Sequence, residues 1–246
     1  MKLRADLLLV QQGLVESRSQ AQKLILAGLV RAGADHLIAS TSDLVDEQVP
    51  LQVEAPLAFV SRGSEKLLPA LDRHLPSLAG LVALDLGAST GGFTDLMLQR
   101  GAIRVYAIDV GHGQLHWKLR QDPRVICREK VNARYLTSQH VPEPVDVLTA
   151  DLSFISLTKV LPAAAPLLRP GGWAFTLVKP QFEAQRQEID KGGVVRDDAV
   201  RQRVVAEITA FAAATLRWTR VDVLPSPILG PKGNQEFVAV FRPAAG

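Results

Sequence analysis

The sequence predicts an α/β protein in which a doubly wound, mostly parallel sheet is preceded by a small α+β domain. Two observations support this prediction. From residue 81 onward, short apolar and β-branched runs alternate with helical patterns, which is typical of parallel sheets covered by helices. Residues 1–58 instead pattern as two short helices and a few short strands. We therefore predict a first domain at 1–58, a linker at 59–64 and a second domain at 65–246.

The elements of the second domain follow from this alternation. Apolar and β-branched runs predict seven strands, at 82–86, 105–110, 125–127, 145–150, 173–178, 219–224 and 237–241. Helical spacing predicts helices at 67–75, 93–100, 157–168 and 197–216. The first five strands have β-α alternation, so they should be parallel. The last two strands have no helix between them, so we expect an antiparallel pairing that gives a seven-stranded sheet with an antiparallel last strand.

In the first domain, helices are predicted over residues 4–12 and 17–28, followed by strands at 29–32 and within 44–53. The charge of this domain is unevenly distributed. Residues 1–31 contain five basic and two acidic residues, whereas residues 32–58 contain five acidic residues and no basic one. The helical half is therefore the half that should attract a polyanion.

Composition narrows the class of protein. The 246 residues carry 28 basic and 25 acidic side chains, a net charge of +3. Cys127 is the single cysteine, which excludes a disulfide within the chain and a cysteine-rich zinc site, and we predict no metal site. No apolar run approaches the ~20 residues that span a bilayer, and the run at 7–10 is too short for a signal peptide. We expect a soluble, cytoplasmic protein that does not bind membranes.

The strongest local signal is a glycine-containing turn after the first strand of the second domain. Small residues between Leu86 and Phe93 let a ligand approach the backbone, and the helix that follows favours negative charge at its start. Asp109 ends the next strand about 20 residues later, where an acid can accept hydrogen bonds from ribose hydroxyls. The candidate cofactor-binding residues are Asp85, Gly87, Ala88, Ser89, Gly91, Gly92, Phe93, Thr94, Asp109, Val110, Asn132, Ala133 and Asp151.

Three interpretations of this turn remain open. A dinucleotide site expects G-x-G-x-x-G, but Ser89 stands where the second glycine should be. Asp85 precedes Gly87 by two residues, as an acid does in loops that bind S-adenosylmethionine, which favours that cofactor over a nicotinamide. The third interpretation is a tight turn without a ligand, and Asn132 on its own is also typical of an ordinary turn.

The type of chemistry can be narrowed from the ends of the strands. Enzymes that methylate amino groups usually carry Asn/Asp-Pro-Pro-aromatic after the fourth strand, but residues 150–154 read Ala-Asp-Leu-Ser-Phe. Methylation at carbon five of a pyrimidine needs a cysteine nucleophile, and Cys127 lies at the third strand instead. A ribose hydroxyl must be oriented and deprotonated, which a buried lysine held by a carboxylate can do. Asp151 and Lys179 end adjacent strands at one sheet edge, although each alone is also an ordinary strand-end charge.

Six motifs together identify a family. They are Ser61-Arg62-Gly63-x-x-Lys66-Leu67, Asp85-Leu-Gly-Ala-Ser-Thr-Gly-Gly-Phe-Thr-Asp95, Asp151-Leu-Ser-Phe-Ile-Ser156, Val178-Lys-Pro-Gln-Phe182, Lys191-Gly-Gly-Val-Val-Arg196 and Gly233-Asn-Gln-Glu-Phe237. On these motifs the chain resembles the TlyA (haemolysin A-like) rRNA 2′-O-methyltransferases. That family joins an S-four-type RNA-binding domain to an FtsJ-like domain with the class I, Rossmann-like fold of S-adenosyl-L-methionine-dependent methyltransferases.

The resemblance implies a catalytic set, two members of which, Lys66 and Glu236, the sequence alone would not have picked out. The Lys-Asp-Lys-Glu set of FtsJ-like enzymes falls on Lys66, Asp151, Lys179 and Glu236. By resemblance, Lys179 is the general base, Lys66 acts electrostatically, and Asp151 and Glu236 orient the lysines. The implied reaction is 2′-O-methylation of a cytidine in 16S or 23S rRNA, or in both. The alternatives are a non-catalytic ribosome-assembly factor and an rRNA base methyltransferase.

The N-terminal segment is similar to the S-four domain in Arg4-Ala-Asp-Leu-Leu, Gly13-x-x-x-Ser17-Arg18 and Ala21-x-x-x-Ile25-x-x-Gly28-x-Val30. The resemblance implies that ribosomal RNA or a ribosomal subunit is the partner, with cations facing its phosphates. The candidate RNA-binding residues are Arg4, Arg18, Lys23, Arg31 and Arg62. Ala39-Ser40 lacks the basic residue often found before the later strand, so we expect weak RNA binding by this domain alone.

Overall fold

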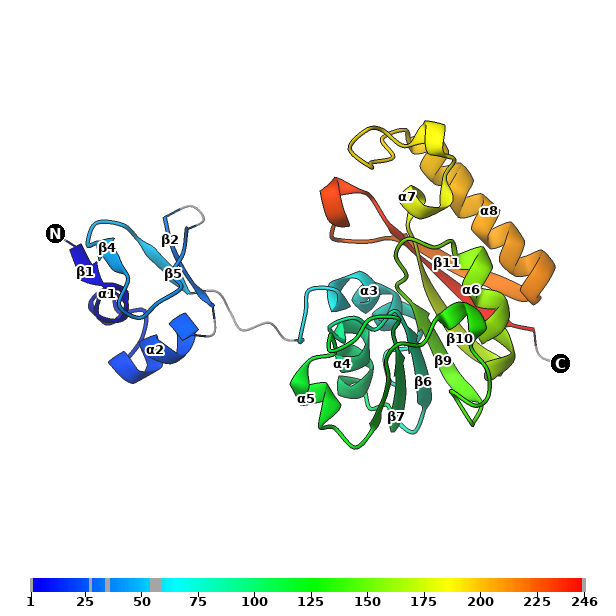
Figure 1. Ribbon diagram of the computed structural model, residues 1–246, viewed down its shortest axis with the longest axis horizontal. Coiled ribbons are helices and arrows are strands. Elements are labelled where there is room, and N and C mark those ends of the chain that lie inside the picture. Colours follow the sequence, from blue (N-terminus) through cyan, green and yellow to red (C-terminus); the bar gives the residue numbers. More distant parts are fainter. Residues whose placement is uncertain (1, 27, 34–35, 54–58, 245–246) are drawn as a thin grey trace. The chain divides into compact units, whose positions relative to one another are not determined.

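The computed structural model describes residues 2–26, 28–33, 36–53 and 59–244, and the chain divides into two compact units, 1–58 and 59–246 (Figure 1). The predicted boundary at residue 58 falls within 54–58, outside the described residues, as do two of the acidic residues counted above, Asp35 and Glu54. Residues 59–64, predicted to be a linker, belong to the second unit. Phe59 and Val60 pack against its apolar core, and the Val60 N–H donates to Asp95 Oδ2 at 2.8 Å.

The first unit is a pair of helices packed on two small antiparallel sheets. One sheet pairs β1 with β4, and the other places β2 between β3 and β5. Its core is fully buried, with Leu8 and Leu9 of α1 and Ile25 of α2 each 0–1% exposed. The elements are β1 (Lys2–Arg4), α1 (Ala5–Gln11), α2 (Arg18–Leu26), β2 (Val30–Ala32), β3 (His36–Leu37), β4 (Leu44–Asp46) and β5 (Leu51–Val53).

The second unit is built on a seven-stranded sheet with the order β11-β12-β10-β9-β6-β7-β8. Only β12 runs against its neighbours, which confirms the predicted doubly wound fold with an antiparallel last strand. The strands are β6 (Val82–Leu86), β7 (Arg104–Ile108), β8 (Val125–Arg128), β9 (Val145–Ala150), β10 (Leu168–Val178), β11 (Trp218–Pro225) and β12 (Phe237–Pro243).

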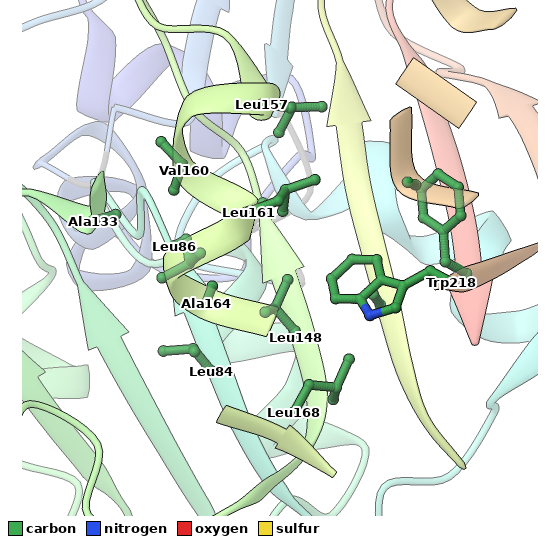
Figure 2. Packing of buried hydrophobic residues seen from close by; sticks show 14 of the residues in the cluster. Leu84, Leu86, Ala133, Leu148, Leu157, Val160, Leu161, Ala164, Leu168 and Trp218 are labelled. Carbon is green, nitrogen blue, oxygen red and sulfur yellow. The ribbon is translucent and has the colours of Figure 1, made fainter. Parts of the chain in front are cut away.

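Helices cover both faces of this sheet. Figure 2 shows the apolar side of α6, including Leu157 and Leu161, over Leu84, Leu86 and Leu148 of the central strands. The opposite face carries α3 and α4, because successive strand residues point to opposite faces and both faces must be covered. The helices are α3 (Ser64–His74), α4 (Gly92–Gln99), α5 (Trp117–Arg120), α6 (Leu157–Ala164), α7 (Pro180–Glu183) and α8 (Asp198–Leu216), with 3₁₀ turns at Ala133–Tyr135, Ala165–Leu167, Arg186–Glu188 and Pro231–Gly233.

Two predicted bounds in the second unit differ from the structure by four residues or more. The helix predicted over 157–168 ends at Ala164 and tightens into a 3₁₀ turn, in which Pro166 lacks the N–H that an α-helix needs. Strand β10 starts at Leu168 instead of residue 173, with a bulge before Trp173. A Cβ on Gly172 would lie 2.8 Å from the backbone oxygen of Asp146, so only glycine passes β9 this closely. Helices α5 and α7 were not predicted because four residues show no helical periodicity.

Candidate active site

The glycine-containing turn lies directly beside the end of β9. Gly87 adopts a φ of +77°, and a Cβ there would lie 2.3 Å from the backbone oxygen of Asp151. The Asp151 N–H also donates to Leu86 O at 2.9 Å. The turn and the first residue after β9 are therefore in direct backbone contact, and a side chain at position 87 would force them apart.

Asp109, at the end of β7, holds this turn in place. Its Oδ2 accepts a hydrogen bond from the Ser89 N–H at 2.8 Å, and its Oδ1 accepts one from the Gly111 N–H at 2.7 Å. The side chain still lines the cavity beside the turn. Each carboxylate oxygen can accept more than one hydrogen bond, so Asp109 can also bind hydroxyl groups of a ligand.

Two cavities meet at the turn. A pocket of about 450 Å³ runs along the ends of β7 and β9, and a smaller cavity of about 120 Å³ lies under the turn. Gly87, Ser89 and Asp151 line both cavities. Of the other candidate cofactor residues, the larger pocket is lined by Asp109, Val110, Asn132 and Ala133, and the smaller by Asp85, Ala88, Gly92 and Phe93.

Two candidate residues line neither cavity. The Thr94 hydroxyl donates to Asp85 Oδ2 at 2.6 Å, beneath the turn. Gly91 faces α5, since a Cβ there would lie 2.2 Å from Leu119 Cδ1 and 2.8 Å from Leu115 Cδ1. Thr94 therefore supports Asp85, and Gly91 lets α5 pack against α4.

Asp85 carries a buried carboxyl group at the smaller cavity. Its side chain accepts hydrogen bonds from the hydroxyls of Thr94 at 2.6 Å and Thr149 at 2.8 Å. Burial raises the pKa of Asp85 to about 6, although both hydroxyls oppose the shift, and the nearby charge of Asp151 raises it further. A cationic group in the smaller cavity would compensate this buried charge.

A chain of polar contacts links six side chains at the carboxyl ends of β9 and β10. Lys179 Nζ lies 2.5 Å from Asp151 Oδ1, and Lys66 Nζ lies 3.8 Å from Asp151 Oδ2. Lys66 Nζ also donates to Glu236 Oε2 at 2.7 Å. At the two ends, Lys179 Nζ donates to Ser153 Oγ at 3.0 Å, and Gln181 Nε2 donates to Glu236 Oε1 at 3.1 Å. The structure thus brings together the four residues of the predicted catalytic set.

The two lysines have different surroundings. Lys66 lies between two carboxylates, one of which, Glu236, is fully buried. Lys179 contacts one carboxylate, the neutral hydroxyl of Ser153 and the ring of Phe182, whose centroid is 5.9 Å from Nζ. Lys66 is therefore flanked by two anions, whereas Lys179 has a single anionic partner, Asp151, which it shares with Lys66.

The two loops beside Glu236 are joined by a buried amide. Asn234 Oδ1 accepts from the Val195 N–H at 3.1 Å, and Asn234 Nδ2 donates to Gly193 O at 3.0 Å. A Cβ on Gly230 would lie 2.1 Å from Glu236 Oε1, so the loop backbone closes over the carboxylate. This places the motifs at 191–196 and 233–237 at the edge of the site as parts of one packed unit.

Comparison with known proteins identifies the family. The model of the FtsJ-like methyltransferase family matches residues 59–242, and the S4 domain, the S-four type named above, matches residues 3–32. The chain belongs to the FtsJ-like methyltransferase family. It is 44% identical over 242 residues to the 16S/23S rRNA (cytidine-2′-O)-methyltransferase TlyA of Mycobacterium tuberculosis strain H37Rv, covering 98% of this chain and 90% of that protein. These matches confirm the resemblance on which the catalytic set was inferred.

Solved structures agree with this assignment. A structure described as a hemolysin from Streptococcus thermophilus is 41% identical, has a TM-score of 0.75 and covers 99% of this chain and 89% of that chain. The N-methyltransferase NodS of Bradyrhizobium japonicum, in complex with S-adenosyl-L-homocysteine, has a TM-score of 0.52 at 16% identity, covering 74% of this chain and 86% of that chain. The second likeness shows the fold alone. None of the helices in the described part of the chain has the length and apolar character to cross a bilayer.

The predicted RNA-binding residues of the S4 domain do not form one exposed set. Arg4 Nη2 and Arg18 Nε lie 3.0 Å and 2.9 Å from Oδ2 of Asp6, whose side chain is fully buried. The Arg4 guanidinium, and then Gln22 and Arg18, hold the pKa of Asp6 well below its usual range. Lys23 of α2 is exposed, and Arg31 is half-buried. Arg62 is also exposed, but it precedes α3 in the FtsJ-like unit.

Several site residues were missed by sequence reasoning. Ser153 and Gln181 end the polar chain, and Ser61 and Gln114 line the cavities. Ser153 had a usable signal, because it follows Asp151 by two residues at the same sheet edge. Gln181 follows Lys179 by two residues, but its contact with Glu236 spans 55 positions of the chain.

Proposed function

We propose that this protein transfers a methyl group from S-adenosyl-L-methionine to the 2′-hydroxyl of a cytidine in 16S or 23S rRNA, or in both. The observation that carries the proposal is the arrangement of Lys66 and Lys179 on the two carboxylate oxygens of Asp151. Asp151 itself lines the pocket that suits the cofactor. A relative 44% identical over nearly the whole chain has this activity as its name.

The two cavities fit the two ends of S-adenosyl-L-methionine. Asp109 can accept hydrogen bonds from the ribose hydroxyls, and Val110, Asn132 and Ala133 can flank the adenine in the larger pocket. The smaller cavity, with the Asp85 carboxyl group, suits the ammonium of the amino-acid end. When bound, the cofactor supplies an electrophilic methyl group on a positively charged sulfur.

Lys179 would act as the general base in this reaction. Its amine would take the proton of the 2′-hydroxyl, whose oxygen would receive the methyl group that the bound cofactor supplies. Asp151 fixes the amine, while the ammonium of Lys66 stabilises charge on the attacking oxygen. Glu236 holds Lys66 through a 2.7 Å hydrogen bond. A positioned base of this kind contributes about 10²–10⁴-fold to the rate.

The S4 domain would bring the RNA to the catalytic unit. Its exposed cations can contact phosphates without reading sequence, which raises the local concentration of RNA at the active site. Recognition through two domains suits a folded RNA, whose overall shape and exposed nucleotides carry the information. A ribosomal substrate would place the protein in the cytoplasm.

The experiment that tests this function uses methyl-labelled S-adenosyl-L-methionine with 30S and 50S subunits from a strain lacking the enzyme. The RNA is then digested to nucleosides and the label is located. Label in 2′-O-methylcytidine is the expected result, and the subunit that carries it identifies the substrate. Label on a base would contradict the assignment of Lys179, and the absence of label with cofactor bound would contradict methyl transfer to these subunits.

A further inference from the structure

Lys179 has a hydrogen-bond partner besides the carboxylate of Asp151, with which it forms an ion pair. Ser153 follows Asp151 by two residues in the connection from β9 to α6, and its Oγ accepts from Lys179 Nζ at 3.0 Å. Ser153 is exposed and lines the larger pocket, whereas the Lys179 side chain is only 7% exposed. Ser153 therefore joins the buried amine to the wall of the larger pocket.

In a neutral amine, the contacts of the two N–H groups determine the direction of the nitrogen lone pair. A neutral lysine amine has two N–H groups and one lone pair, which together with the bond to Cε point to the four corners of a tetrahedron. Asp151 Oδ1 forms an ion pair with Lys179 Nζ and Ser153 Oγ accepts a hydrogen bond from it, so the two oxygens together can engage both N–H groups. The lone pair is then left to point along the remaining direction, where it can accept the proton of a hydroxyl group.

We propose that Ser153 is a positioning residue that aims the lone pair of Lys179 at the nucleophilic hydroxyl of the substrate. This inference rests on the proposed function, in which Lys179 is the general base. A single acceptor would let the amine rotate about the Cε–Nζ bond and spread the lone pair over several directions. Two acceptors at fixed positions remove that freedom before the substrate arrives, which is the benefit of preorganisation.

The chemistry of serine suits this position better than a second acid would. A carboxylate at position 153 would favour the charged amine and would oppose proton removal from the substrate. A neutral hydroxyl orients the amine with a weaker preference for its charged form. Among the described residues, the groups that face Lys179 are Asp151 and Ser153 after β9 and the Phe182 ring of α7, with Lys66 and Glu236 beyond Asp151.

The test is the variant Ser153→Ala, compared with the unaltered protein over a range of pH. The expected result is a kcat about tenfold lower, the value of one lost hydrogen bond. The KM for RNA and the affinity for the cofactor should stay unchanged. Loss of an acceptor also makes the charged amine less favourable, so the pH at which kcat is half-maximal should shift to lower values. A change in packing alone would not shift that midpoint.

Two further variants separate orientation from packing. Ser153→Thr keeps the hydroxyl and should restore most of the kcat and the original pH midpoint. Thr158→Ala is the matched control, because it removes a hydroxyl at the start of α6 whose bond is to Ser156 Oγ, at 2.7 Å. An unchanged kcat and pH midpoint in Ser153→Ala would overturn the proposal, as would a loss that Ser153→Thr does not restore.

One readout does not depend on turnover. The ¹³C NMR signal of lysine Cε follows the protonation of each amine, and Lys179 is assigned by its absence from Lys179→Ala. The Ser153→Ala variant should titrate with a lower midpoint than the unaltered protein. If this shift occurs while no RNA is methylated, the contact is correct and the proposed function is wrong. If RNA is methylated and no shift occurs in either assay, the function stands and the inference fails.

Discussion

Each unit of the molecule holds a cluster in which cations meet a buried carboxylate, and the two clusters are built from different cations. In the S4 domain, Arg4 and Arg18 contact the fully buried Asp6, and their own side chains are 38% and 52% exposed. In the FtsJ-like unit, Lys66 and Lys179 are 11% and 7% exposed. The arginines hold a carboxylate in place while they remain in contact with solvent, whereas the lysines are withdrawn from it.

This difference separates a cluster that maintains structure from one suited to chemistry. Arginine stays charged at any physiological pH, so its contact with Asp6 is permanent. A lysine amine can act as a base, which an arginine guanidinium cannot. The type of cation is visible in the sequence, whereas its exposure and its carboxylate partner are seen only in the structure.

The largest expected effect is the loss of turnover in Lys179→Ala. Removing the base should lower kcat by about 10²–10⁴-fold while S-adenosyl-L-methionine still binds. The matched variant in the other cluster, Arg18→Ala, should leave kcat at saturating RNA roughly unchanged. Single-turnover methylation and calorimetric cofactor titration measure both quantities. Appreciable residual turnover in Lys179→Ala would remove this lysine as the base.

A second expected effect concerns the stability of the S4 domain. Asp6→Asn removes the charge from hydrogen bonds to Arg4 and Arg18, which should lower the free energy of unfolding of this domain by about 1.5–3 kcal/mol. Because the pKa of Asp6 is lowered by folding, its contribution is fully present above the unfolded value and is lost progressively as pH falls from that value through the lower folded one. Calorimetric unfolding should show a smaller difference between variant and unaltered protein at pH 3 than at pH 7.

A third, smaller effect is a pH dependence of cofactor binding through Asp85. Its pKa is raised to about 6, so the carboxyl is mostly protonated at pH 5 and mostly ionised at pH 7.5. If the ionised form pairs with the cofactor ammonium, affinity should rise about tenfold between these values. Folding stability should move the other way, because burial of the carboxylate becomes unfavourable as pH rises from the unfolded pKa through about 6. Asp85→Asn should abolish both dependences, which calorimetry and thermal unfolding can check.

The smallest effect is expected from a single exposed cation of the S4 domain. Lys23→Ala should weaken RNA binding several-fold and reduce the slope of log affinity against log salt by about 0.7–0.9, the value for one phosphate contact. Folding and kcat should not change, since Lys23 is exposed on α2. A filter-binding salt series with ribosomal RNA measures this slope, and Glu16→Gln on the same unit serves as the control. An unchanged slope would show that Lys23 does not contact phosphate.

The fold was predictable from sequence because its signals are local. Strands β6 and β9 match their predicted bounds, since both are continuous apolar runs between turns. The turn at Gly87 was predictable because only small residues fit it, and Asp151 and Lys179 because strand ends collect at one sheet edge. Short elements such as β1, β3, α5 and α7 were missed, since a few residues carry no periodicity.

The rest of the site depends on contacts that sequence patterns do not show. Lys66 and Glu236 are 170 residues apart, and only the family resemblance indicated that they meet. The same limit applies to the S4 domain, where Arg4 and Arg18 were expected to face phosphates and their contact with Asp6 was not predicted. Their pairing became visible only with α1 and α2 in place. The buried carboxylate of Asp6 thus partly neutralises two of the cations that were expected to bind RNA.

The close contact between Gly87 and the backbone of Asp151 joins the turn that we propose binds the cofactor to the carboxylate that we propose orients the lysines. A cofactor that fixes the conformation of the turn therefore also fixes the position of Asp151. An RNA that contacts the lysines next to Asp151 affects the conformation of the same backbone. Thermodynamic linkage then requires reciprocity: whatever factor the cofactor contributes to RNA affinity, RNA returns to cofactor affinity. We expect the two ligands to bind with positive cooperativity, and the enzyme to discriminate against RNA while it carries no methyl donor.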